Sequence, residues 1–136
     1  KSMENSNMFV HTSIRTSNME KSIDFYSKFF GMKLSSRREI KETNAEIAFL
    51  QDPQGKGAIL ELTLYRKQAN FTQPNYEDRV FDHLGFEVQD INQTIATMKK
   101  ENVVISDEPF KLGPNEPVIA FIEDPDGTLI ELIQRK

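Results

Sequence analysis

The chain has 136 residues, the size of one ordinary domain, and its 38% hydrophobic and 28% charged residues are typical of a globular protein. It contains no cysteine, which excludes disulfide bonds and thiolate metal sites, so any metal must be held by nitrogen and oxygen ligands. The net charge of −4 argues against nucleic acid, because phosphate binding needs a basic surface. No run of about 18 apolar residues exists to span a membrane, and residues 1–7 are polar with no apolar signal region. We therefore expect a cytoplasmic protein without a membrane partner.

An internal repeat organises the sequence. Residues 47–55 recur as residues 119–127, an offset of 72, and after two extra residues in the first copy the offset becomes 70. The equated positions include Phe9 and Phe81, His11 and His83, and Glu61 and Glu131. We predict a single domain over residues 1–136, made of two modules. These cover about 8–66 and 79–134 and are joined by a polar linker at 67–78.

The first module begins with residues 9–15, which alternate loosely between apolar and polar side chains and predict a strand. Ser17 and Glu20 resemble a capping box at a helix start, and Gly31 can adopt the left-handed conformation that ends a helix. The apolar face of this helix consists of Met19, Ile23, Tyr26 and Phe30. Three strands are predicted near 32–40, 45–51 and 58–65, with a turn at 52–55.

The second module repeats this order. A strand at 84–88 precedes a helix that Asp90 and Gln93 cap and that Asn102 ends. The apolar face of this helix consists of Ile91, Ile95 and Met98. Three strands are predicted near 103–107, 117–123 and 128–134, with a loop at 111–117 and a turn at 124–127. The pattern therefore predicts an α+β fold of two βαβββ modules.

The repeat equates the only two histidines of the chain, His11 and His83, and two acids inside apolar strand runs, Glu61 and Glu131. A single histidine at a strand start is more often a satisfied polar residue than a ligand, and a single glutamate in a strand usually faces solvent. Four residues at repeat-equivalent positions favour a shared role, because a two-fold repeat brings equivalent residues to one axis. Two His and two Glu suit Zn, Ni, Co, Fe or Mn.

The sequence also resembles the vicinal oxygen chelate superfamily and, within it, glyoxalase I (lactoylglutathione lyase). The similar stretches lie at residues 11–15, 22–26, 31–34, 61–63, 83–86 and 119–131. The resemblance implies that His11, Glu61, His83 and Glu131 hold one divalent metal, with Ni or Zn as the first candidates and Co, Mn or Fe also open. It further implies a homodimer in which paired modules form half-barrels around the metal, with ligands from one or both subunits.

The same resemblance implies an activity in methylglyoxal detoxification. Glyoxalase I converts the methylglyoxal–glutathione hemithioacetal to S-lactoylglutathione by proton transfer through an enediolate that a metal stabilises. By resemblance Glu131 is the chief catalytic base, and Glu61 is a ligand and possible second base. A desolvated carboxylate beside a cation can serve as a base.

Arg15, Arg79 and Lys111 are candidate contacts for the carboxylates of glutathione, since such groups call for arginine or lysine. An ordinary surface role is equally open for the two arginines. Tyr65 stands where some members of the family have asparagine, and Lys111 matches the family lysine only loosely. Another thiol adduct, or a different substrate with vicinal oxygens, therefore stays open.

Other metalloenzymes of the superfamily are the alternative interpretation. An acyl-CoA epimerase commonly has glutamine at the place of Glu61, and Glu46 could be its extra base. An extradiol dioxygenase uses two His and one carboxylate, and a thiol transferase acting on an antibiotic epoxide is a further candidate. A non-catalytic binding protein of this fold would lack the metal set, so the four candidate ligands disfavour it.

Overall fold

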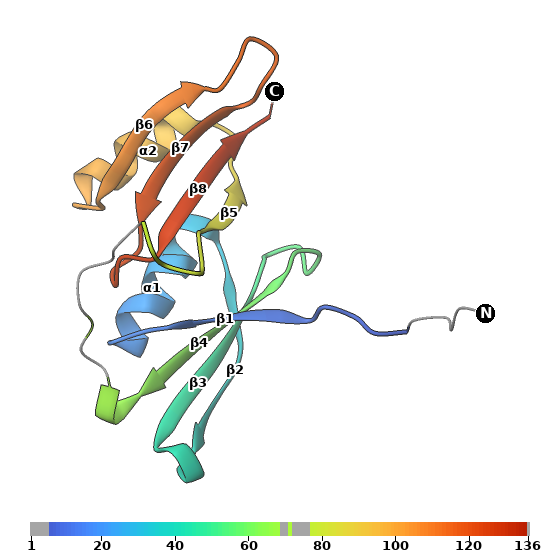
Figure 1. Cartoon of the computed structure of the whole chain (residues 1–136), viewed down its shortest axis with the longest axis vertical. Helices are drawn as coiled ribbons and strands as arrows, with labels where there is room; N and C mark the ends of the chain where they lie inside the picture. Colours follow the sequence, from blue (N-terminus) through green and yellow to red (C-terminus); the bar gives the residue numbers. More distant parts are fainter. Residues whose placement is uncertain (1–5, 69–70, 72–76, 136) are drawn as a thin grey trace.

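The computed structural model describes residues 6–68, 71 and 77–135, which form two four-stranded sheets and two α-helices (Figure 1). The first module consists of β1 (His11–Arg15), α1 (Met19–Phe30), β2 (Lys33–Ile40), β3 (Ala45–Gln51) and β4 (Ile59–Tyr65). The second consists of β5 (Leu84–Glu87), α2 (Ile91–Lys100), β6 (Ile105–Lys111), β7 (Val118–Glu123) and β8 (Leu129–Gln134). The predicted α+β class and the βαβββ repeat are confirmed. Of the predicted linker, residues 69–70 and 72–76 lie outside the described residues.

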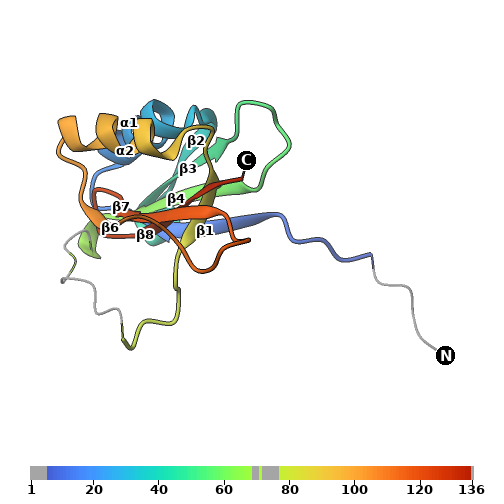
Figure 2. The same ribbon diagram turned by 90° about the horizontal axis from the view of Figure 1, so that it is seen from above.

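The two sheets have the same topology. Their strand orders are β1-β4-β3-β2 and β5-β8-β7-β6, with the first and last strand of each module paired in parallel and the other pairs antiparallel. A parallel pair needs a crossover connection, and each module supplies its helix for this purpose. Both helices lie on the same side of the strands (Figure 2). Among the described residues, the other side of both sheets carries no helix and is therefore open to a ligand or a second chain.

Neither described helix is long and apolar enough to cross a membrane.

Local capping explains where the helices begin and end. The N-cap of α1 is Asn18, whose side chain accepts from the backbone N–H of Lys21, so the prediction of Ser17 as the cap was wrong by one residue. Gly31 ends α1 with φ of 66°, in the predicted left-handed conformation. The predicted cap of α2 is confirmed, because Asp90 accepts from the N–H of Gln93.

Strand β6 differs most from the sequence prediction. It covers Ile105–Lys111 and not 103–107, and it includes Pro109. Its pairing with β7 shifts register between Asp107 and Phe110. An edge strand can hold a proline, whose missing N–H then faces away from the neighbouring strand. A period-two pattern cannot show such a shift, which is why the strand was predicted too short.

A buried carboxylate joins the two modules. Asp124, immediately after β7, is only 5% exposed and accepts hydrogen bonds from the Tyr26 hydroxyl at 2.8 Å and from the N–H groups of Asp126 and Thr128, each at 2.9 Å. Burial raises the pKa of Asp124 above its usual value, because these donors only partly replace the lost hydration. Ionised Asp124 therefore lowers the free energy of unfolding. Its carboxylate also accepts hydrogen bonds from three donors at fixed positions.

A raised pKa has a predictable effect on stability. The folded chain binds the Asp124 proton more tightly than the unfolded chain. The free energy of unfolding should therefore fall as the pH rises from the pKa of Asp124 in the unfolded chain to its higher pKa in the folded chain. Asp124→Asn cannot ionise and should lack this contribution. We expect the unfolding free energy of the wild type minus that of the variant to decrease between about pH 4 and pH 7 in urea titrations. A difference that is constant or increases with pH would contradict the prediction.

Candidate metal-binding site

Each module brings one histidine against one glutamate. In the first, Nε2 of His11 on β1 lies 3.4 Å from Oε1 of Glu61 on β4. In the second, Nε2 of His83, just before β5, lies 3.2 Å from Oε1 of Glu131 on β8. The glutamates are the less exposed partners, with 14% and 20% of their side chains accessible. The repeat thus yields two half-sites with nearly the same geometry.

A phenylalanine completes each half-site. The ring of His11 meets the ring of Phe49 edge-on with centroids 5.4 Å apart, and His83 meets Phe121 in the same way at 5.5 Å. Phe49 lies opposite Glu61 in the β3–β4 register, and Phe121 lies opposite Glu131 in the β7–β8 register. The edge-on contact restricts each imidazole, which favours a fixed ligand geometry.

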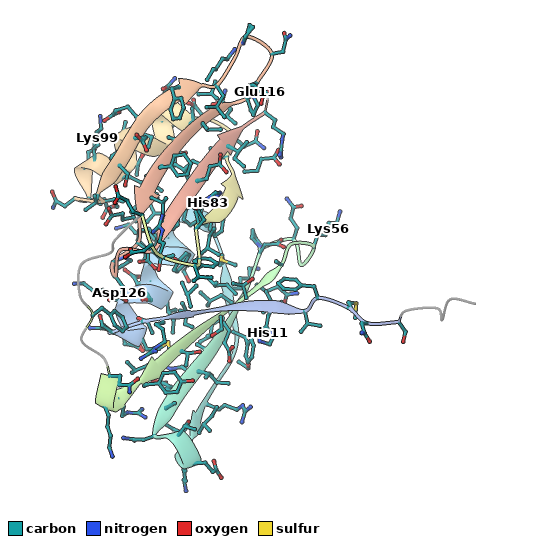
Figure 3. All side chains as sticks on the ribbon, in the orientation of Figure 1. His11, Lys56, His83, Lys99, Glu116 and Asp126 are labelled. Atoms are coloured by element: carbon teal, nitrogen blue, oxygen red, sulfur yellow. The ribbon has the colours of Figure 1, made fainter. Side chains whose placement is uncertain are left out.

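The two half-sites do not meet within one chain. Among the residues that the structure describes, no three His, Asp or Glu side chains are placed to hold one metal ion. His11 lies on β1 of the first sheet, whereas His83 lies just before β5 of the second sheet (Figure 3). The structure therefore brings the four predicted ligands together as two pairs, and a single ion shared by all four stays a prediction that needs a second chain.

The donor set and spacing of each pair fit a divalent cation. Ligands about 2.0–2.2 Å from Zn²⁺, separated by tetrahedral to octahedral angles, lie about 3.0–3.5 Å from each other. The N–O distances of 3.4 Å and 3.2 Å fall in this interval. Each pair alone supplies only two of the four ligands that a protein zinc site usually has. Two pairs together would supply a complete His₂Glu₂ set.

Asp82 supports the second histidine. Its Oδ1 lies 2.7 Å from Nδ1 of His83, and this hydrogen bond is the main cause that lowers the pKa of Asp82, with the charges of His83 and Arg79 acting in the same direction. A proton held on Nδ1 leaves the Nε2 lone pair free for a cation. A carboxylate behind a ligating imidazole is a recurrent arrangement in metal sites.

Arg15 lies on the same face of β1 as His11, since the two are four residues apart on one strand. Its guanidinium lies over the ring of Tyr65 at 4.6 Å and that of Phe71 at 5.7 Å, and it donates to the backbone oxygen and Oε1 of Gln68. This candidate substrate contact is held in a fixed position by cation–π and hydrogen-bond interactions.

The positions of the other two candidate substrate contacts, Arg79 and Lys111, give less support to a role at this site. Arg79 is half-buried ahead of β5, close enough to Asp82 to affect the pKa of that carboxyl. Lys111 is exposed and pairs with Val118, which in turn pairs with Gln134. Gln134 and Glu131 are three residues apart on β8 and face opposite sides, so the register places Lys111 on the face away from Glu131.

Glu46, the candidate extra base of an epimerase, has a structural role. It accepts a hydrogen bond from Arg37, and its Oε1 lies 4.0 Å from Arg66. It is three residues from Phe49 on β3, which places it on the face of the sheet opposite to Glu61. The geometry gives no support to Glu46 as a base at this site.

The family of the chain follows from comparison with known proteins. Residues 8–132 match the family model described as the Glyoxalase/Bleomycin resistance protein/Dioxygenase superfamily. The chain belongs to this superfamily. The matched segment contains both His–Glu pairs, so the superfamily assignment covers the candidate site as well as the fold.

Several lactoylglutathione lyases are similar to this chain over nearly their full length. The lactoylglutathione lyase of Neisseria meningitidis is 37% identical over 130 residues, covering 93% of this chain and 90% of the relative. That of Escherichia coli O157:H7 is 33% identical over 129 residues, covering 93% and 92%. The trypanothione-dependent glyoxalase I of Leishmania major has a similar structure, with a TM-score of 0.77, 30% identity and coverage of 95% and 87%.

The sequence analysis did not single out three residues that contact or face the candidate ligands: Phe49, Phe121 and Asp82. Phe49 and Phe121 could have been found, because they are equated by the same repeat offset that equates the histidines. Asp82 carried no repeat signal, since its counterpart is Val10. The contact between Arg15 and Tyr65 could not be derived from spacing alone, because it depends on the pairing of two strands far apart in sequence.

Proposed function

We propose that this member of the superfamily is a metal-dependent lactoylglutathione lyase that converts the methylglyoxal–glutathione hemithioacetal to S-lactoylglutathione. The observation that carries the proposal is the pair of matching half-sites, His11 with Glu61 and His83 with Glu131, in a chain similar to lactoylglutathione lyases over nearly its whole length. The proposed role is methylglyoxal detoxification, and Ni²⁺ and Zn²⁺ are the first metals to test because His and Glu suit both.

The reaction moves a proton between two adjacent carbons, and the site contains the groups for it. A divalent cation held by these residues would stabilise negative charge on the two neighbouring substrate oxygens. Glu131 is the proposed base that takes the proton from one carbon and returns it to the next, and Glu61 is a ligand and possible second base. Ile130 and Leu132 flank Glu131, and their side chains point to the helix side, leaving the carboxylate on the open face.

We further propose that the active protein is a homodimer whose two sites each combine the first module of one chain with the second module of the other. The separation of the pairs within one chain supports this arrangement. Apolar side chains beside both histidines also support it: Phe9 is 79% exposed, Val80 fully exposed and Phe81 45% exposed. Exposed apolar groups clustered around a polar site indicate a surface that another chain covers.

The thiol of the substrate is proposed to be glutathione, with Arg15 as the contact for one of its carboxylates. The Arg15 guanidinium is oriented by Gln68 and Tyr65 on the metal-ligand face of the first module. The Leishmania major relative is trypanothione-dependent, so trypanothione is the alternative thiol to test for this chain. Turnover of hemithioacetals made from glutathione and from trypanothione would identify the preferred thiol.

Glu131→Gln tests the base. The amide oxygen can still ligate a cation but cannot accept the proton, so we expect retained metal content and a loss in kcat of about 100-fold or more. Metal content and hemithioacetal isomerisation are the measurements, with Glu61→Gln as the repeat-equivalent control. Near-normal turnover by Glu131→Gln would refute its role as the chief base.

Mixing two inactive variants tests the shared site. A chain carrying His11→Ala has an intact second module, and a chain carrying Glu131→Gln has an intact first module. After subunit exchange of equal amounts, half of the dimers are mixed and each has one intact site, so we expect about a quarter of wild-type activity. The control mixture, His11→Ala with Glu61→Ala, damages the same module in both chains and should stay inactive. Equal inactivity of the two mixtures would contradict ligand sharing between chains.

Asp82→Asn tests the support of His83. Loss of the carboxylate behind the imidazole should weaken Zn²⁺ binding about tenfold, as for other groups that orient metal ligands. Competition with a chromogenic chelator measures the affinity, and Asp24→Asn on the exposed face of α1 is the matched control. An unchanged affinity in Asp82→Asn would show that the hydrogen bond has no part in metal binding.

A further inference from the structure

Helix α1 and the residues at its start carry the contacts between the two modules. The Ser17 N–H donates to Oδ2 of Asp126 at 3.0 Å, and the Ser17 hydroxyl donates to Oδ1 of the same carboxylate. The Phe30 ring stacks on Phe86 of β5 with centroids 3.9 Å apart. Asp126, in the turn between β7 and β8, lies beside α1 (Figure 3). Helix α1 and Ser17 just before it thus bind the first module to the second through several contacts.

The buried member of this set is the hydrogen bond between Tyr26 and Asp124. Tyr26 is fully buried, and its hydroxyl donates to Oδ2 of Asp124 at 2.8 Å. Burial, followed by the charge of Asp124, raises the pKa of Tyr26 well above its usual value, so the hydroxyl stays a donor. A bond from a buried donor to a buried carboxylate is stronger and more directional than the exposed ion pairs at the surface.

The repeat-equivalent contact on the other side of the chain lacks this bond. The counterparts of Tyr26 and Asp124 are Met98 and Asp52, and Met98 has no hydroxyl. Asp52 accepts instead from the backbone N–H groups of Gln54 and Gly57 in its own turn. A cleft of about 780 Å³ lies between this turn and the start of α2, lined among others by Asp52, Gln54, Gln89 and Thr94. Phe30 and Phe86, which stack across the modules, also line this cleft, so the difference between the two sides is the Tyr26–Asp124 hydrogen bond.

We propose that Tyr26 and Asp124 form an inter-module latch that sets the angle between the modules and so positions the two His–Glu pairs for metal binding. This inference rests on the proposed function, in which each ion is shared between two chains. Tyr26 is a positioning residue here, since it touches neither metal ligands nor substrate.

Closed symmetry explains how a latch far from the ligands affects them. In a two-fold dimer with shared sites, the four modules form a ring in which latches inside each chain alternate with metal sites between chains. A change of angle at either latch must be accommodated at both sites, because the ring has to close. A looser latch admits more arrangements in which the two pairs are too far apart to share an ion, which lowers the apparent metal affinity.

Tyr26→Phe removes the hydroxyl and keeps the buried ring. We expect its Zn²⁺ dissociation constant, measured by chelator competition on the metal-free protein, to rise about tenfold, which corresponds to a tenfold smaller fraction of dimers in the arrangement that can share an ion. The matched control is Ser22→Ala. Ser22 is as deeply buried as Tyr26, but its hydroxyl bonds to Thr16 inside the first module at 2.6 Å. Its affinity should stay within about twofold of wild type for a comparable loss of stability.

A second variant, Ser17→Ala, removes the exposed hydrogen bond from Ser17 to Asp126 in the turn between β7 and β8. It leaves the buried core unchanged, so it keeps the test valid if Tyr26→Phe folds poorly. Its affinity should decrease in the same direction by a smaller factor. Wild-type affinity in both Tyr26→Phe and Ser17→Ala would overturn the latch, as would an equal loss in Ser22→Ala. If the wild type itself binds no Zn²⁺ and the mixing experiment recovers no activity, the proposed function fails instead.

Discussion

Parallel pairing of the first and last strand in each module is the constraint on which the site depends. β1 runs beside β4 with Ser13 opposite Glu61, and β5 runs beside β8 with Gly85 opposite Glu131. This register places each histidine, two residues earlier, diagonally across from its glutamate and on the same face. The crossover helix that makes a parallel pair possible occupies the other face, so the ligands are left on the open side. Topology and ligand geometry are therefore one feature of the fold.

Under the proposed function, the open side of a single chain holds only two incomplete halves of a metal site. Each half-site has a histidine, a glutamate and a phenylalanine, and a single pair gives a cation too few ligands to hold it firmly. Apolar side chains beside both histidines, Phe9, Val80 and Phe81, are 79%, fully and 45% exposed in one chain. A second copy would satisfy both deficits with one surface, because a two-fold axis matches the first module of each chain to the second module of the other.

The sequence predicted the elements and the identity of the candidate ligands because both depend on local periodicity and on the repeat. The offset that equates His11 with His83 needs no knowledge of distances, and β3 begins and ends at the predicted residues. The angle between the modules depends instead on long-range contacts such as Tyr26 with Asp124, which are 98 positions apart. No local pattern encodes the distance between these two residues, so the sequence left open whether the four candidate ligands meet within one chain or between two.

The two modules have matching candidate ligands but different contacts between each helix and the other module. They agree in the side chains of the half-sites, down to the edge-on phenylalanines, but they differ in how each helix meets the turn of the other module. A hydrogen bond at both of these inter-module contacts would restrict the angle between the modules more than one bond does. Tyr26 bonds to Asp124, whereas Met98, the counterpart of Tyr26, has no hydroxyl that could bond to Asp52. The strength of that single buried bond then decides how closely the half-sites are held to the geometry that an ion requires.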